Sequence, residues 1–201
     1  MKKKIPVIIA LILTIAAAVF VGNTRKANRI YDNNVNTISY ADLGVLEDGR
    51  YISQEFICRE DVIDGFIIKS SVAGNHADVT VHLQLKDAQT GEILAEASEQ
   101  GSNIRARKMH FYKMDTMNGM KGKDLILTVT EEGAQNGSGI LMYYAPGQET
   151  QFRINVDGEE LDGVLPMATA TDRFDTETCV IFLLSLWFIW GFMWALYKLF
   201  Q

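Results

Sequence analysis

Hydrophobic positions gather in two uncharged runs near the ends of the chain, and short alternating patterns fill the segment between them. The first run covers residues 5–22, and the second begins at Cys179 and holds all three tryptophans of the chain. A helix needs about 20 apolar residues to cross the hydrocarbon core of a bilayer. The pattern therefore predicts two transmembrane α-helices, over residues 5–22 and 179–197.

The first run also fits a second interpretation. Three lysines at residues 2–4 precede it, and Ala16, Ala17 and Ala18 offer a small-residue cleavage site, as in a secretory signal peptide. An uncleaved anchor and a cleaved signal both export the segment that follows.

The charges beside the two runs predict the orientation. Lysines stand at residues 2–4 and at Lys198, whereas the flank at 172–177 is acidic, although residues 25–26 are basic. Basic residues favour the cytoplasmic side of a membrane. We therefore expect cytoplasmic termini, at residues 1–4 and 198–201, around an extracytoplasmic middle.

Small residues recur at every fourth position in both runs. Such a stripe lets helix backbones approach closely, so it could pair the two spans or dock a membrane partner; an alanine-rich segment also gives this spacing by chance. The candidate packing residues are Ala10, Thr14, Ala18, Gly22, Gly191 and Ala195.

Between the runs, apolar residues alternate with polar ones in short stretches separated by Gly, Asn and Asp. Val79, Val81, Leu83 and Leu85 alternate with polar residues, which is typical of a half-buried strand. Further strands are expected over 51–59, 65–72, 93–95, 109–114, 125–130, 140–144, 151–156 and 159–165, the last two joined at Asp157-Gly158. Strands at this spacing, without interleaved helices, predict a mainly β fold, an antiparallel two-sheet sandwich over residues 38–165. Residues 23–37 and 166–178 are expected to be linkers.

Three stretches carry a resemblance to a known kind of domain. Residues 49–56, residues 63–66 and residues 83–94, with their Asp-x-x-Thr-Gly-Glu turn, resemble a recurring jelly-roll ectodomain of bacterial membrane proteins. That domain is similar to carbohydrate-binding modules and occurs in proteins of surface-polysaccharide assembly. The resemblance covers about residues 45–165 and implies a fold and a location; it assigns no binding residue.

Net charge excludes one class of partner. Residues 23–178 contain 15 basic and 25 acidic side chains, a formal charge of 15 − 25 = −10. A nucleic-acid-binding protein would carry a basic surface, so we expect no nucleic-acid partner. Two cysteines, Cys58 and Cys179, are too few for a disulfide-rich scaffold or a four-cysteine zinc site.

Catalytic and metal-binding motifs fail on inspection. The chain has no G-x-S-x-G elbow and no H-E-x-x-H pair. Glu60, Asp61 and Asp64 could contribute to a loop calcium site, but a solvated acidic loop is the favoured interpretation. We assign no catalytic residue, no metal site and no cofactor.

Exposed aromatic rings are the usual contacts of sugar-binding proteins. Phe111 and Tyr112 are neighbours on one predicted strand and must point to opposite faces, as must Tyr143 and Tyr144. Tyr112, Tyr143 and Tyr144 are therefore the candidate contacts for a glycan or protein partner.

These features favour a non-enzymatic membrane-anchored accessory subunit of a polysaccharide synthesis or export complex. Its expected partners are the membrane, a membrane protein such as a glycosyltransferase, and a polysaccharide. The alternative is a stand-alone membrane-tethered module that binds a glycan or a protein.

Overall fold

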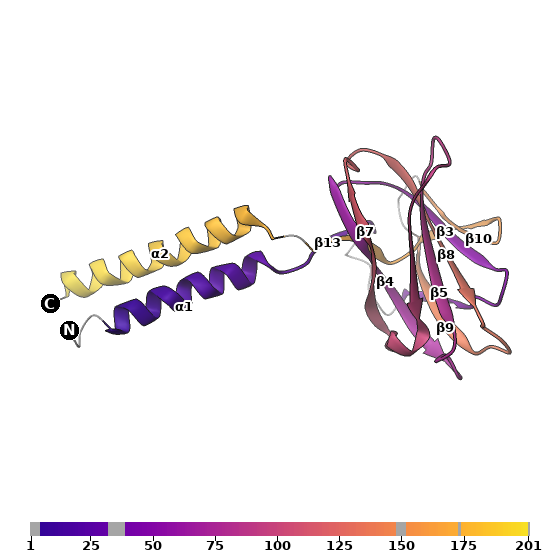
Figure 1. Cartoon of the computed structure of the whole chain (residues 1–201), viewed down its shortest axis with the longest axis horizontal. Coiled ribbons are helices and arrows are strands. Elements are labelled where there is room, and N and C mark those ends of the chain that lie inside the picture. The colour runs from indigo at the N-terminus through magenta and orange to yellow at the C-terminus, as the bar shows by residue number, and fades with distance from the viewer. Residues whose placement is uncertain (1–4, 32–38, 148–151, 173, 201) are drawn as a thin grey trace. The chain divides into compact units, whose positions relative to one another are not determined.

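The computed structural model describes residues 5–31, 39–147, 152–172 and 174–200. The chain forms two compact units. Residues 27–171 make one unit, the head, and residues 1–26 with 172–201 make the other, the helical hairpin. The head is mainly β, and Figure 1 shows its strands arranged in two layers.

The described strands of the head form two sheets, and every pairing with a resolved register is antiparallel. The six-stranded sheet has the order β11 (Glu159–Leu161), β10 (Ile154–Val156), β3 (Tyr51–Ile57), β8 (Asp124–Glu132), β5 (Thr80–Asp87) and β6 (Ile93–Gln100). The seven-stranded sheet has the order β1 (Lys26–Arg29), β13 (Met167–Thr171), β4 (Val62–Ala73), β9 (Gly139–Pro146) and β12 (Gly163–Val164). In addition, β2 (Ala41–Val45) pairs with β9 and β7 (Lys108–Asn118) pairs with β4. The 3₁₀ turn η2 (Gly101–Asn103) follows β6.

The core lies between the two sheets, where the inward side chains of alternate positions meet. Leu83 and Leu85 of β5 are fully buried, whereas Thr80 and Gln84 of the same strand are partly exposed. This alternation confirms the half-buried strand predicted from the sequence. Across the core, the rings of Phe56 in β3 and Phe66 in β4 meet edge to face, with centroids 5.9 Å apart.

Both predicted hairpins form because their turn residues supply the required hydrogen bonds or backbone angles. The Asp87 carboxylate accepts the amide N–H groups of Gln89 at 2.9 Å and Thr90 at 3.0 Å, which closes the β5–β6 turn. Asp157 and Gly158 both have positive φ, 53° and 91°, as a two-residue type I′ turn between β10 and β11 requires.

The two predicted linkers are not simple connections. β1 lies inside the expected linker 23–37, and β13 lies inside the expected linker 166–178. Ala168 and Ala170 of β13 are fully buried, and β13 pairs with β4 from Met167 to Ala170. Small residues carry a weak strand signal by themselves, so tertiary pairing decides this segment. The head is therefore wider than the predicted 38–165.

The helical hairpin consists of α1 (Ile5–Gly22) and α2 (Thr176–Leu199). The end of α1 meets the start of α2, since a Cβ atom on Gly22 would lie 2.9 Å from the Cβ of Cys179. Figure 1 shows the two helices side by side. Asp175 caps α2, and its carboxylate accepts the N–H of Thr178 at 3.1 Å.

Only one of the two expected spans meets the length and composition of a membrane helix within the described residues. That helix is α2, 24 residues long, and it has no buried residue. The apolar part of α1 that the structure describes, Ile8–Gly22, is shorter.

Candidate functional site

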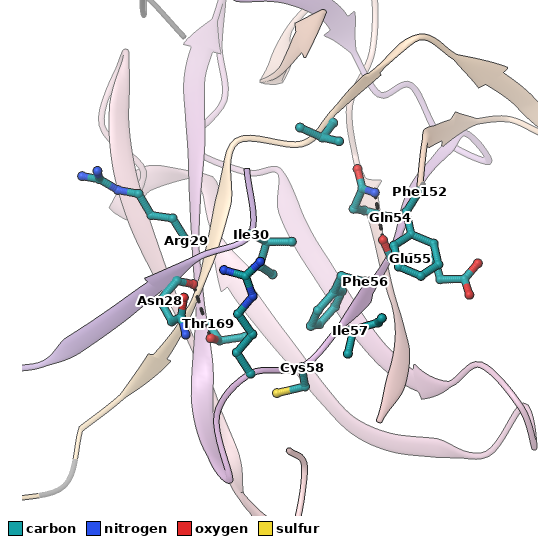
Figure 2. Close-up of a pocket in the computed structure, with 12 residues that line it drawn as sticks. Asn28, Arg29, Ile30, Gln54, Glu55, Phe56, Ile57, Cys58, Phe152 and Thr169 are labelled. Atoms are coloured by element: carbon teal, nitrogen blue, oxygen red, sulfur yellow. Dashed lines mark hydrogen bonds between the residues drawn. The ribbon is translucent and has the colours of Figure 1, made fainter. Parts of the chain in front are cut away.

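The head contains a pocket of about 350 Å³ between the β1 edge of one sheet and β3 of the other. Apolar side chains form part of its lining, with Phe56 fully buried and Ile57 44% exposed. Figure 2 shows Asn28, Arg29, Ile30 and Thr169 on one side of the pocket and the segment from Gln54 to Ile57 on the other. The full lining is Asn28, Arg29, Ile30, Gln54, Glu55, Phe56, Ile57, Cys58, Arg59, Phe152, Val164 and Thr169.

Hydrogen bonds fix the polar wall of this pocket. Gln54 is buried, accepts the N–H of Leu165 at 2.9 Å and donates to the carbonyl of Glu55 at 2.9 Å. Asn28 donates to the carboxylate of Glu60 at 2.9 Å. These bonds tie β3 to the residue after β12 and tie β1 to the loop after β3, so they shape the pocket wall.

Cys58 and two arginines complete the lining. The Cys58 thiol donates to the carbonyl of Glu60 at 3.1 Å, and burial raises the pKa of this thiol, so Cys58 stays a neutral core group. Arg29 and Arg59 are exposed, and neither forms an ion pair within the described part of the chain. In Figure 2 the Arg29 side chain extends away from Phe56 and Cys58. The pocket thus joins an apolar floor to a rim of mixed charge, with Arg59 and Glu55, which suits a ligand with polar and apolar parts.

Tyr112, one of the predicted contacts, belongs to the core. Its side chain is fully buried, and burial raises the pKa of its hydroxyl group far above the ordinary range. The outward neighbour is Phe111, whose ring covers Gly65 and lies 2.8 Å from the point where a Cβ would sit. Strand alternation correctly separates the two rings, but it does not tell which of them faces inward.

Tyr143 and Tyr144 are both half-buried and point to different environments. Tyr144 packs against the core and also lines a second pocket. In that pocket Arg50 Nε lies 2.6 Å from Asp157 Oδ2. Tyr143 lies on the outer side beside Lys69, whose Nζ is 5.6 Å from its ring centroid.

Lys69 joins Tyr143 to a second pair of rings. Its Nζ is 4.7 Å from the Tyr40 ring, and Tyr40 meets Tyr31 edge to face at 6.3 Å. Burial, followed by the hydrogen bond with Tyr31, raises the pKa of Tyr40 to about 12. These residues form an aromatic and cationic surface group that the sequence did not single out, because Tyr31, Tyr40 and Lys69 are far apart along the chain.

The candidate packing residues of the helices divide into two sets. On α1, Thr14, Ala18 and Gly22 are buried and Ala10 is partly buried, so this stripe forms the inner face of the hairpin. On α2, Gly191 and Ala195 are exposed, and a Cβ on Gly191 would meet no atom within 4 Å. The inner face of α2 instead uses larger side chains, Cys179, Phe182, Leu183 and Leu186.

Ion pairs close the hairpin where the two helices join. The Arg25 guanidinium donates to both carboxylate oxygens of Asp172, and Lys26 pairs with Asp175. The hydrogen bond from Lys26, with those from Thr178, holds the pKa of Asp175 well below its ordinary range. Arg25 and Lys26, whose charges oppose the expected orientation, are thus paired with the acidic residues beside them.

Among the described residues, no group of three or more His, Cys, Asp and Glu side chains is arranged to hold a metal ion. Asp64 instead accepts the Thr116 hydroxyl at 2.6 Å, and Glu60 accepts from Asn28. Comparison of the chain with protein-family models and with curated proteins gives no match.

Proposed function

We propose that this protein is a non-enzymatic accessory subunit of a membrane complex that makes or exports a surface polysaccharide. In this proposal both helices cross the membrane, both termini are cytoplasmic and the head faces outward. The observation that carries the proposal is the apolar outer surface of the helical hairpin.

Large apolar side chains cover the outside of both helices. On α1, Ile12, Leu13 and Phe20 are 59%, 63% and 77% exposed, and on α2, Phe188 and Trp194 are 75% and 62% exposed. Water would penalise a continuous apolar surface of this kind, whereas lipid or a partner's helices would cover it. Since α1 packs on α2 and shares this surface, the hairpin is best accommodated with both helices in the bilayer.

The basic residues beside the two helices support the proposed orientation. The positive-inside rule counts lysines and arginines near the ends of a span, and acidic residues contribute little to it. Residues 2–4 and Lys198 supply four basic side chains on the side of the termini, whereas Arg25 and Lys26 supply two on the side of the head. The larger count favours cytoplasmic termini.

The partner in this proposal is a membrane enzyme such as a glycosyltransferase. The inner stripe of α1 is already used within the hairpin, which leaves the exposed Gly191 and Ala195 of α2 as the place where a second protein's helix could approach closely. The head pocket, with its apolar floor and Arg59 rim, is the surface offered to the exported polymer.

The pocket by itself favours a second candidate function, a stand-alone tethered module that binds a glycan or a protein. Such a module needs the pocket and an anchor but no partner in the membrane. The two functions therefore differ in whether the outer face of α2 matters.

Complementation of a deletion strain separates the two functions, with surface polysaccharide as the measured quantity. Ile57→Asn changes the pocket wall, and Gly191→Leu blocks the open face of α2. The matched controls are Ile93→Asn, at another exposed strand isoleucine (50%), and Met193→Leu, at an exposed helix position (61%). We expect both test variants to lower the polysaccharide several-fold and both controls to restore it.

A loss of surface polysaccharide with Ile57→Asn but not with Gly191→Leu would favour the tethered module. Full complementation by both test variants, at normal protein levels, would contradict both functions.

A further inference from the structure

The interior of the sandwich holds polar atoms that have no hydrogen-bond partner within the described residues. They are Ser70 Oγ, His110 Nε2, Tyr112 Oη and one carboxylate oxygen of Glu131, Oε1. Buried polar groups are normally paired, so each exception calls for a physical reason. Glu131 is the member of this set whose charge is most costly to bury, because an unpaired carboxylate in an apolar interior loses its hydration.

Glu131 connects the two sheets through its other oxygen. It lies on β8 of the six-stranded sheet, where Leu125, Leu127 and Val129 precede it on the inward side. Its Oε2 accepts the N–H of Ile140, on β9 of the other sheet, at 2.9 Å. The N–H of Leu46, just after β2, also donates to this carboxyl group.

Gly139 makes room for this contact. A Cβ at Gly139 would lie 2.8 Å from Glu131 Oε2 and 2.6 Å from a methyl group of Val45. Any larger residue at position 139 would push the carboxyl group away from β9. The position is therefore shaped around the Glu131 side chain.

The charged and titratable groups around Glu131 oppose its ionisation. Asp48 adds negative charge from the loop before β3, and Tyr112 of β7 faces both Glu131 and Glu99 of β6. His110 of β7 stands 3.6 Å from Glu99 and packs edge to face on Tyr112 at 4.8 Å. No Lys, Arg or His in the described part of the head forms an ion pair with Glu131.

We propose that Glu131 is a proton-linked tie between the two sheets: protonated on Oε1, it holds β9 and the end of β2 against β8, and its ionisation loosens them. Oε1 carries the proton because Oε2 already accepts backbone N–H groups. A neutral acid leaves one O–H donor unpaired, whereas a carboxylate would leave a buried charge without a cationic partner, which costs more.

The direction of the pH dependence follows from linkage. Burial raises the pKa of Glu131 from its ordinary 4.5 to about 7, so the folded head binds this proton more tightly than the unfolded chain does. The contribution of Glu131 is fully present below about pH 4.5 and is lost as the pH rises through about 7. Between pH 7.5 and 5.5, the equilibrium constant that favours β9 and β2 held against β8 should rise about 20-fold.

Hydrogen exchange of the full-length protein in detergent tests this proposal. We expect the protection factors of β8 and β9 amides, corrected for intrinsic exchange, to rise about 20-fold from pH 7.5 to 5.5. Glu131→Gln, which mimics the neutral acid, should keep high protection at both pH values. Glu159→Gln, at an exposed carboxylate of β11, should behave like the parent protein.

The ¹³C carboxyl shift of Glu131 provides a second measurement, which does not depend on folding of the variant. We expect its titration midpoint near 7. A midpoint near 4.5, or an equal pH dependence in the parent protein and in Glu131→Gln, would overturn the proposal.

Discussion

At the residue scale, Tyr112 shows how burial changes the role of a side chain. Its hydroxyl oxygen has no partner in hydrogen-bond geometry within the described residues, and its ring is fully enclosed. The Ser70 hydroxyl beside it interacts with this oxygen and partly offsets the rise in its pKa, although the two atoms do not reach hydrogen-bond geometry. Tyr112 therefore packs as a core ring, and burial of its hydroxyl oxygen lowers the stability of the head.

Tyr112→Phe tests this assignment. Because the substitution removes an unsatisfied buried oxygen and keeps the ring, we expect the free energy of unfolding to stay level or to rise by about 1 kcal/mol. Binding of polysaccharide to the protein should not change. A loss of more than about 2 kcal/mol would mean that the hydroxyl group has a hydrogen-bond partner.

At the element scale, the sequence predicted strands where alternation is strong and missed them where side chains are small. β5 and β8 place apolar residues at every second position, and both were expected. β13 has the sequence Met-Ala-Thr-Ala-Thr, whose alternation is between small residues, and its strand forms because it pairs with β4. The pocket escaped prediction for the same reason, since Asn28 and Thr169 lie in β1 and β13, inside the expected linkers.

The sequence also did not show which face of an alternating strand points toward the core. Alternation separates neighbouring side chains but leaves open which of them faces the core, so Tyr112 was assigned to the wrong side. Glu131 carried a usable signal, because it continues the buried series Leu125, Leu127 and Val129 at the same spacing. A charge at the end of an inward series marks either the end of the core or a buried acid, and here it is the second.

The helical hairpin gives a prediction at the same scale. Ala18 is 1% exposed on the inner face of α1, whereas Val19 is 49% exposed. In lipid, helices associate through close packing, so Ala18→Leu should separate α1 from α2, while Val19→Leu should leave them paired. Disulfide crosslinking between the natural Cys179 and Asn23→Cys, at the exposed position next to Gly22, reports the pairing and leaves the close approach at Gly22 unchanged.

Ala18→Leu should lower the crosslinked fraction by about tenfold, since the added bulk must displace the neighbouring helix. Equal crosslinking in both variants would show that the small-residue stripe does not hold the hairpin.

At the scale of the whole molecule, chemistry is concentrated in the head and the apolar surface in the hairpin. The head combines a pocket with an internal acid, and residues 23–178 have a formal charge of −10. The hairpin has an outer surface of Ile, Leu, Phe and Trp, and the ion pairs among its described residues lie at the junction. The two-span arrangement with an external head is therefore the central claim.

Cysteine labelling in intact cells tests this claim most directly. Gln89 is exposed in the β5–β6 turn, and Leu199 is 78% exposed at the end of α2. With the parent protein as the background, Gln89→Cys should react with a membrane-impermeant maleimide before lysis, and Leu199→Cys only after lysis. Labelling of Gln89→Cys only after lysis, or of Leu199→Cys in intact cells, would contradict the claim.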